Sequence, residues 1–240
     1  MKQVTRDFQK RSLKLERIDT GDYTSEEYER FLQEIRLVNR FAGDTRALKK
    51  SLIREIRKSE LQSFSVLDVG AGSGELLRVI AGFARKTKRR TNLCGVELNS
   101  RSADAILEES QAFGEISSVQ TTALDLPFAD KSFDYGICSL FTHHFTDENV
   151  IKILRELARV SRRKIFVIDL HRHRMAYFFY QLFCAGLRIS PLVREDGSLS
   201  ILRAFVPVEL EILAERADLK NVRVSRCLPF RLVLEAEGSN

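Results

Sequence analysis

A glycine-rich turn is the segment of this 240-residue sequence whose residue types and spacing most clearly indicate chemistry. The apolar run 64–69 leads into Gly70, Gly72 and Gly74, and a helical pattern begins at Glu75. Glycine permits positive φ angles and lets a ligand approach the main chain, so the turn predicts a ligand site at a strand end. A dinucleotide-binding loop would place its third glycine one residue later, and Glu75 would be a poor neighbour for a pyrophosphate.

Two adjacent histidines, His143 and His144, come after the apolar run 133–140. An imidazole titrates near neutral pH and can take a proton from a phenol or another hydroxyl group. We therefore predict this pair as the candidate catalytic base, with His144 preferred. The alternative is that the pair only shapes a cofactor pocket.

A second histidine pair, His171 and His173, alternates with two arginines after a later apolar run. These side chains either bind an anionic substrate group or lie solvated at a strand end. The aromatic segment 175–183 comes next, and a helix without a polar face is buried all round or faces an apolar ligand. We predict His171, His173, Tyr177 and Tyr180 as candidate substrate contacts, with core packing as the alternative for the aromatic segment.

Regular elements must position these residues, and strand and helix patterns alternate from residue 64 onward. Predicted strands cover 64–69, 92–97, 116–122, 133–140, 164–170, 222–227 and 231–236, and predicted helices cover 75–85, 101–112, 147–160, 175–186 and 207–217. Such alternation is typical of a parallel sheet with helices on both faces, so the fold class is α/β, doubly wound and Rossmann-like. Three residues separate the last two strands, which predicts an antiparallel hairpin, and the section around Pro191 and Gly197 is predicted to be irregular.

The N-terminal quarter shows a different pattern. Residues 25–58 form two amphipathic helical runs that meet at Gly43, and Ser25 is the predicted N-cap of the first. We predict that residues 1–60 form a helical lid or extension and that residues 61–240 form the catalytic domain.

The glycine-rich turn resembles motif I of the class I S-adenosylmethionine-dependent methyltransferases. Glu97 at the end of the second strand, Asp125 and Leu126 after the third, and the fourth strand extend the resemblance over most of the chain. The resemblance implies a seven-stranded sheet, S-adenosylmethionine as the cofactor, Asp68 near its methionine moiety, and Glu97 at its ribose. The complete set of cofactor contacts that we predict is Asp68, Gly70, Ala71, Gly72, Gly74, Glu97, Leu98, Asp125, Leu126, Ser139 and, from the lid, Arg40.

The segment after the fourth strand indicates which class of molecule accepts the methyl group. Members that methylate amide or exocyclic amino nitrogens carry an Asn/Asp-Pro-Pro-Tyr/Phe motif there, which this sequence lacks. Resemblance to a subgroup associated with polyketide genes implies a small phenolic acceptor. We predict methyl transfer, most readily to oxygen, on a small hydrophobic or phenolic molecule of secondary-metabolite or quinone type.

Charge and cysteine content leave two further functions open. The net charge of +6 and the basic run 85–90 raise RNA methylation as an alternative, and an inactive cofactor-binding scaffold subunit is another. The four cysteines form no metal-ligand or disulfide pattern, so we expect no metal and a cytoplasmic location. No apolar run reaches the roughly 20 residues that span a bilayer, and monomer and homodimer remain open.

Overall fold

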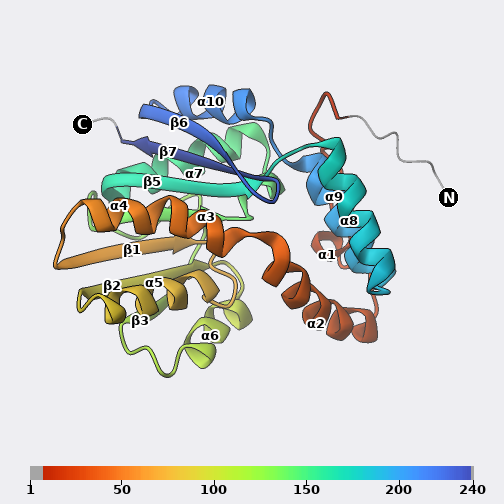
Figure 1. Cartoon of the computed structure of the whole chain (residues 1–240), viewed down its shortest axis with the longest axis horizontal. Coiled ribbons are helices and arrows are strands. Elements are labelled where there is room, and N and C mark those ends of the chain that lie inside the picture. Colours follow the sequence, from red (N-terminus) through yellow and green to blue (C-terminus); the bar gives the residue numbers. More distant parts are fainter. Residues whose placement is uncertain (1–7, 239–240) are drawn as a thin grey trace.

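A seven-stranded sheet forms the centre of the molecule (Figure 1). The computed structural model describes residues 8–238, without the side chains at 36 and 39–42. The strand order is β3-β2-β1-β4-β5-β7-β6. The strands are β1 (Ser63–Val69), β2 (Arg90–Glu97), β3 (Ile116–Gln120), β4 (Phe133–Ser139), β5 (Ser161–Leu170), β6 (Lys220–Cys227) and β7 (Arg231–Glu237).

The pairing confirms the predicted doubly wound α/β class. Strands β1 to β5 are parallel, whereas β7 runs antiparallel to both β5 and β6 and closes the predicted hairpin. The predicted strand and helix bounds between residues 64 and 186 agree with the structure to within three residues. The apolar pattern therefore determines this half of the fold locally.

Helices cover both faces of the sheet. One face is covered by α3 (Asp44–Lys50), α4 (Leu52–Lys58), α5 (Glu75–Lys86) and α6 (Ser100–Glu109), and the other by α7 (Asp147–Val160) and α10 (Pro207–Arg216). Strand side chains alternate between the two resulting cores: Phe166 and Ile168 of β5 lie in one, and Ile165 and Val167 lie in the other. The predicted domain boundary at residue 60 stays a prediction, and the structure places α3 and α4 on the sheet.

A third group of helices lies beyond the carboxyl ends of the parallel strands (Figure 1). It consists of α1 (Arg17–Thr20), α2 (Ser25–Ala42), α8 (Arg174–Gly186) and α9 (Pro191–Arg203). Helix α9 packs against the other three. Among the described residues, no helix is long and apolar enough to cross a membrane.

Two local predictions in this helical group are wrong. The N-cap of α2 is Thr24 rather than Ser25, because the Thr24 hydroxyl accepts from the Glu27 N–H while the Glu27 carboxylate accepts from the Thr24 N–H. The section around Pro191 and Gly197 is helical, because Pro191 is the first residue of α9, where a missing N–H costs nothing.

Candidate active site

The glycine loop joins β1 to α5 at the carboxyl edge of the sheet. Gly70, Gly72 and Gly74 have φ angles of +72°, +59° and +80°, which side chains with a Cβ rarely adopt. The N–H groups of Gly70 and Ala71 both donate to the Val96 carbonyl of β2, at 2.9 and 3.2 Å. The loop is therefore held against the neighbouring strand, with its remaining main-chain groups directed to the edge.

Two carboxylates flank this loop. Asp68 of β1 is 1% exposed, and its Oδ1 has no hydrogen-bond partner among the described residues. Burial, together with the charge of Glu97, raises the pKa of Asp68 to about 8. Glu97 ends β2 and accepts a hydrogen bond from the Gly72 N–H at 2.5 Å. A cationic ligand group at the loop would supply the partner that Asp68 lacks.

The first histidine pair contacts the glycine loop through its own segment. The one-turn helix η1 (Thr142–His144) comes after β4, and the Phe141 ring before it packs so closely on Gly70 that a Cβ there would overlap the ring. The predicted catalytic pair and the predicted cofactor loop are thus neighbours.

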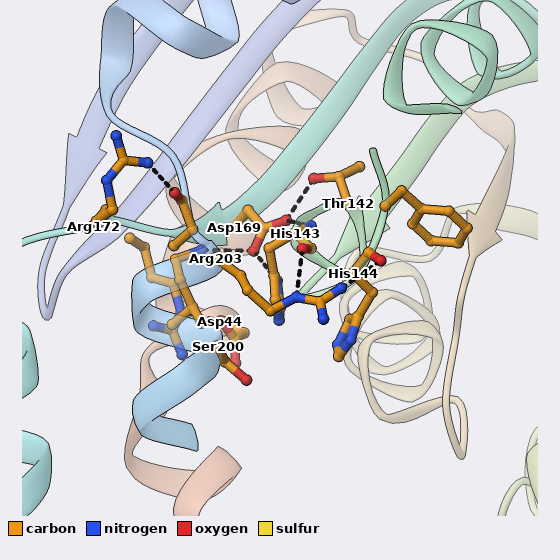
Figure 2. A network of polar contacts seen from close by, with 12 residues as sticks. Asp44, Thr142, His143, His144, Asp169, Arg172, Ser200 and Arg203 are labelled. Atoms are coloured by element: carbon orange, nitrogen blue, oxygen red, sulfur yellow. Dashed lines mark hydrogen bonds and ion pairs between the residues drawn. The ribbon is translucent and has the colours of Figure 1, made fainter. Parts of the chain in front are cut away.

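A buried carboxylate holds the first of these histidines. Figure 2 shows Asp169, at the end of β5, beside Thr142 and His143. One Asp169 oxygen lies 2.6 Å from His143 Nδ1, and the other accepts from the Thr142 hydroxyl and the His143 N–H. Burial would raise the pKa of Asp169, but His143 and these hydrogen bonds outweigh it and lower the pKa to about 2. Asp169 is therefore a fixed negative charge that orients His143.

The second histidine is the more accessible of the pair. The His144 side chain is 30% exposed, against 3% for His143, and the two rings lie 4.2 Å apart. His144 Nδ1 lies 3.6 Å from an Asp19 oxygen and 3.9 Å from a Glu16 oxygen, with no hydrogen-bond partner among the described residues. His144 lowers the pKa of Asp19. A ligand can thus reach His144, and two carboxylates stand beside it.

Glu16 was not predicted from the sequence. It is 3% exposed, it accepts from the Ser200 hydroxyl at 2.8 Å, and burial raises its pKa against the opposing effect of His144. Arg203, also buried, lies 3.9 Å from the same Glu16 oxygen and donates to the carbonyls of His143 and His144. Arg203 thereby fixes the main chain of η1.

The ligand atoms of Glu16, His143 and His144 lie within 4.8 Å of one another, which is a possible metal-ligand set. A divalent cation there would stand beside the Arg203 guanidinium, which is an unfavourable neighbour for it. This neighbour makes the cluster less suited to a divalent cation.

Residues 8–20 cross the site and bring Glu16 and Asp19 to it. Arg11 pairs with Asp147, donates to the Phe145 carbonyl at 3.1 Å, and lies 4.0 Å from the centre of the Phe205 ring. No local sequence pattern could have indicated this placement, since the partners of Arg11 and Glu16 lie more than 100 residues away.

The predicted substrate contacts lie just after β5 and on α8. His171 is buried, its ring is 5.3 Å from that of His173, and burial with nearby cationic groups lowers its pKa to about 4. His171 is therefore neutral at pH 7. Tyr177 packs edge-on against Phe8, and the Tyr180 hydroxyl donates to a carbonyl of α9. The role of these four residues in substrate binding stays a prediction.

The remaining predicted contacts are spread along the same edge of the sheet. Ser139 ends β4, Leu98 comes after Glu97 and is 70% exposed, and Leu126 is buried next to the exposed Asp125. Arg40 belongs to α2, but its side chain lies outside the described residues.

The basic run 85–90 lies at the amino end of β2, away from this edge. Arg85 pairs with Glu115, and Arg89 donates to the Ile56 carbonyl. These two arginines support the fold locally.

Comparison with known proteins agrees with this arrangement. Residues 67–168 match the methyltransferase domain family. The O-methyltransferase rstn1 of Aspergillus nomiae is 31% identical over 128 residues, a match that covers 48% of this chain and 54% of that protein. A demethylmenaquinone methyltransferase of Bacillus licheniformis is 24% identical over 176 residues, covering 66% of this chain and 72% of that protein.

A solved structure shares the fold. It is the magnesium protoporphyrin IX methyltransferase of Synechocystis PCC 6803 with bound SAH, with a TM-score of 0.62 and 15% identity over 92% of this chain and 99% of that chain. For two of the curated relatives, the matched region spans only 36% and 54% of their length. Residues 67–168 thus match a methyltransferase domain, and the chain shares the seven-stranded fold of a solved methyltransferase.

Proposed function

We propose that this protein transfers a methyl group from S-adenosylmethionine to a hydroxyl group of a small hydrophobic or phenolic acceptor of secondary-metabolite or quinone type. The observation that carries the proposal is that an accessible histidine, His144, follows three residues after Phe141, whose ring packs on a glycine loop with an unpartnered buried carboxylate. The names of two relatives, an O-methyltransferase and a demethylmenaquinone methyltransferase, support an acceptor of this class.

The residues of the glycine loop fit the cofactor. Bound S-adenosylmethionine supplies an electrophilic methyl group on a cationic sulfur. Its methionine moiety also carries an ammonium group, and Asp68 is the buried acceptor that such a group satisfies. Glu97 would then accept from the ribose hydroxyls, in place of or beside its bond to Gly72.

His144 would remove the acceptor proton. In this step the acceptor O–H bond would break and its proton would move to an imidazole nitrogen of His144. The freed oxygen would bond to the methyl carbon while the carbon–sulfur bond breaks and its electron pair stays on the departing sulfur. The carboxylates of Glu16 and Asp19 would stabilise the imidazolium at distances of 3.6 to 3.9 Å. His143, held by Asp169, and Arg203 would fix the position of the helix that carries the base.

Two measurements test this function. Calorimetry should show binding of S-adenosylmethionine, and Glu97→Ala should weaken it at least about tenfold, which corresponds to about 1.4 kcal/mol. Mass spectrometry of reactions with a panel of phenols and quinols should then show a product heavier by one methylene unit.

Other outcomes would favour the rival functions. Absence of binding would contradict any use of this cofactor. Binding without any methylated product would favour a scaffold, and turnover on RNA transcripts with salt-sensitive binding would favour RNA methylation.

A further inference from the structure

We propose that helix α8 is a docking surface for an anionic lipid membrane. Met175, Phe178, Phe179 and Leu182, here called the α8 apolar face, are 44%, 58%, 48% and 59% exposed. Their spacing of three and four residues places them on one side of the helix. Large apolar side chains that are exposed together on one face mark a site of interaction.

The apolar surface continues onto neighbouring elements. An open hollow of about 660 Å³ lies between α2 and α8, and its lining residues are Leu37, Phe179, Leu182, Phe183, Gly186 and Leu187. On the other side, the Phe179 ring lies 6.1 Å from that of Phe230 in the β6–β7 turn, where Leu228 is 67% exposed. Helix α8 lies at the end of the molecule beyond the strand carboxyl ends (Figure 1).

The charges that flank this face along the chain are of one sign. Every Asp, Glu, Lys or Arg between Asp169 and Glu195 is an arginine. Arg174 precedes the α8 apolar face and Arg188 comes after it, and both are exposed. Nearby acidic groups are engaged elsewhere: Glu34 binds Arg30 and the Ser190 N–H, and Glu195 pairs with Arg17. Apolar side chains flanked by cationic ones suit the interface of a membrane with anionic headgroups.

The same charges disfavour a second copy of the chain as the occupant. A twofold contact through this face would place the same patch of each copy together, including Arg174 and Arg188, without acidic partners on the helix. A membrane has no such conflict, because its apolar interior accepts the aromatic side chains while its phosphates accept the guanidinium groups.

Sedimentation with vesicles tests the proposal on the full chain. We expect it to sediment with vesicles that contain phosphatidylglycerol, less with pure phosphatidylcholine, and less again at high salt. The double variant Phe178→Gln, Leu182→Gln should bind the anionic vesicles at least tenfold more weakly. The matched control is Val208→Gln, Ile212→Gln on α10, whose side chains are 54% and 49% exposed and which should bind as the unchanged protein does.

Calorimetry with S-adenosylmethionine on both double variants shows whether the fold is retained, independently of vesicle binding. Equal vesicle binding by the two double variants would overturn the proposal. So would absence of vesicle binding together with a dimer in analytical ultracentrifugation that the Phe178→Gln, Leu182→Gln variant loses.

Discussion

At the residue scale, Asp68 is a carboxyl group placed where its charge is unfavourable until a ligand arrives. Its pKa of about 8 in the folded chain exceeds the value of about 3.9 expected in the unfolded chain. The folded state therefore binds an extra proton between about pH 4 and pH 8, and the stability of the free protein falls as pH rises through that window.

Asp68→Asn should remove this dependence. We expect the melting temperature of the variant without cofactor to exceed that of the unchanged protein at pH 8, by about 2–4 °C for each kcal/mol recovered, and the difference to shrink toward pH 5. Affinity for S-adenosylmethionine should fall at least about tenfold. Thermal denaturation across pH and calorimetry measure these effects, and a pH-independent difference in melting temperature would contradict the assigned cause.

The proposed role of His144 as the base can be tested by measuring turnover and cofactor binding separately. His144→Ala should lower kcat by about 10²–10⁴-fold, the usual contribution of a general base, and should leave the dissociation constant for S-adenosylmethionine within about twofold. Turnover of the unchanged protein should persist in EDTA, since the proton role needs no metal. Loss of turnover in EDTA with recovery on adding a divalent metal would instead assign Glu16, His143 and His144 to a metal.

At the element scale, α9 is a helix that the apolar pattern of the sequence could not predict. The strands and the helices α5 to α8 have apolar stripes or runs that sequence reasoning can find. The buried residues of α9 include Asp196, Ser198 and Arg203, so the helix has no apolar stripe, although it packs against three other helices. Gly197 in the interior of α9 also indicated a break in the helix. In the structure, the absence of a side chain at Gly197 makes room for the Tyr180 ring.

Two glycines inside helices should respond to alanine with opposite sign. A Cβ at Gly197 would overlap the Tyr180 hydroxyl, so Gly197→Ala should destabilise the protein by about 1–3 kcal/mol. At Gly82 of α5 a Cβ would meet open space, so Gly82→Ala should stabilise it by about 0.5–1 kcal/mol. Urea denaturation measures both, and similar effects at the two positions would show that Tyr180 is not the cause.

At the scale of the whole molecule, the site divides into a part that sequence can predict and a part that it cannot. The glycine loop, Glu97 and the histidine pair lie at strand ends, and parallel strands bring their carboxyl ends to one edge. Asp169 lies at the same edge and could have been found by the same argument. Glu16 and Asp19 could not, because long-range contacts of residues 8–20 determine their positions.

Asp196 is the anchor through which this long-range docking can be tested. Its buried carboxylate accepts from the N–H groups of Arg17 and Ile18, both at 2.9 Å. Asp196→Ala should loosen residues 8–20 and lower kcat at least about tenfold, while cofactor affinity changes less than about twofold. The neighbouring Glu195→Ala removes only an exposed ion pair and should leave kcat near that of the unchanged protein. Equal losses in the two variants would show that this docking does not support catalysis.

The docking of residues 8–20 also bears on the order in which the protein matures during synthesis. The ribosome releases Glu16 long before Ser200 and Arg203, the side chains that receive it. A nascent chain can form β1, β2 and the glycine loop while its first helix still lacks a surface to pack on. We expect the ability to hold the cofactor to precede the ability to use it, because α9 and β7, which complete the surroundings of Glu16 and Asp169, are translated later.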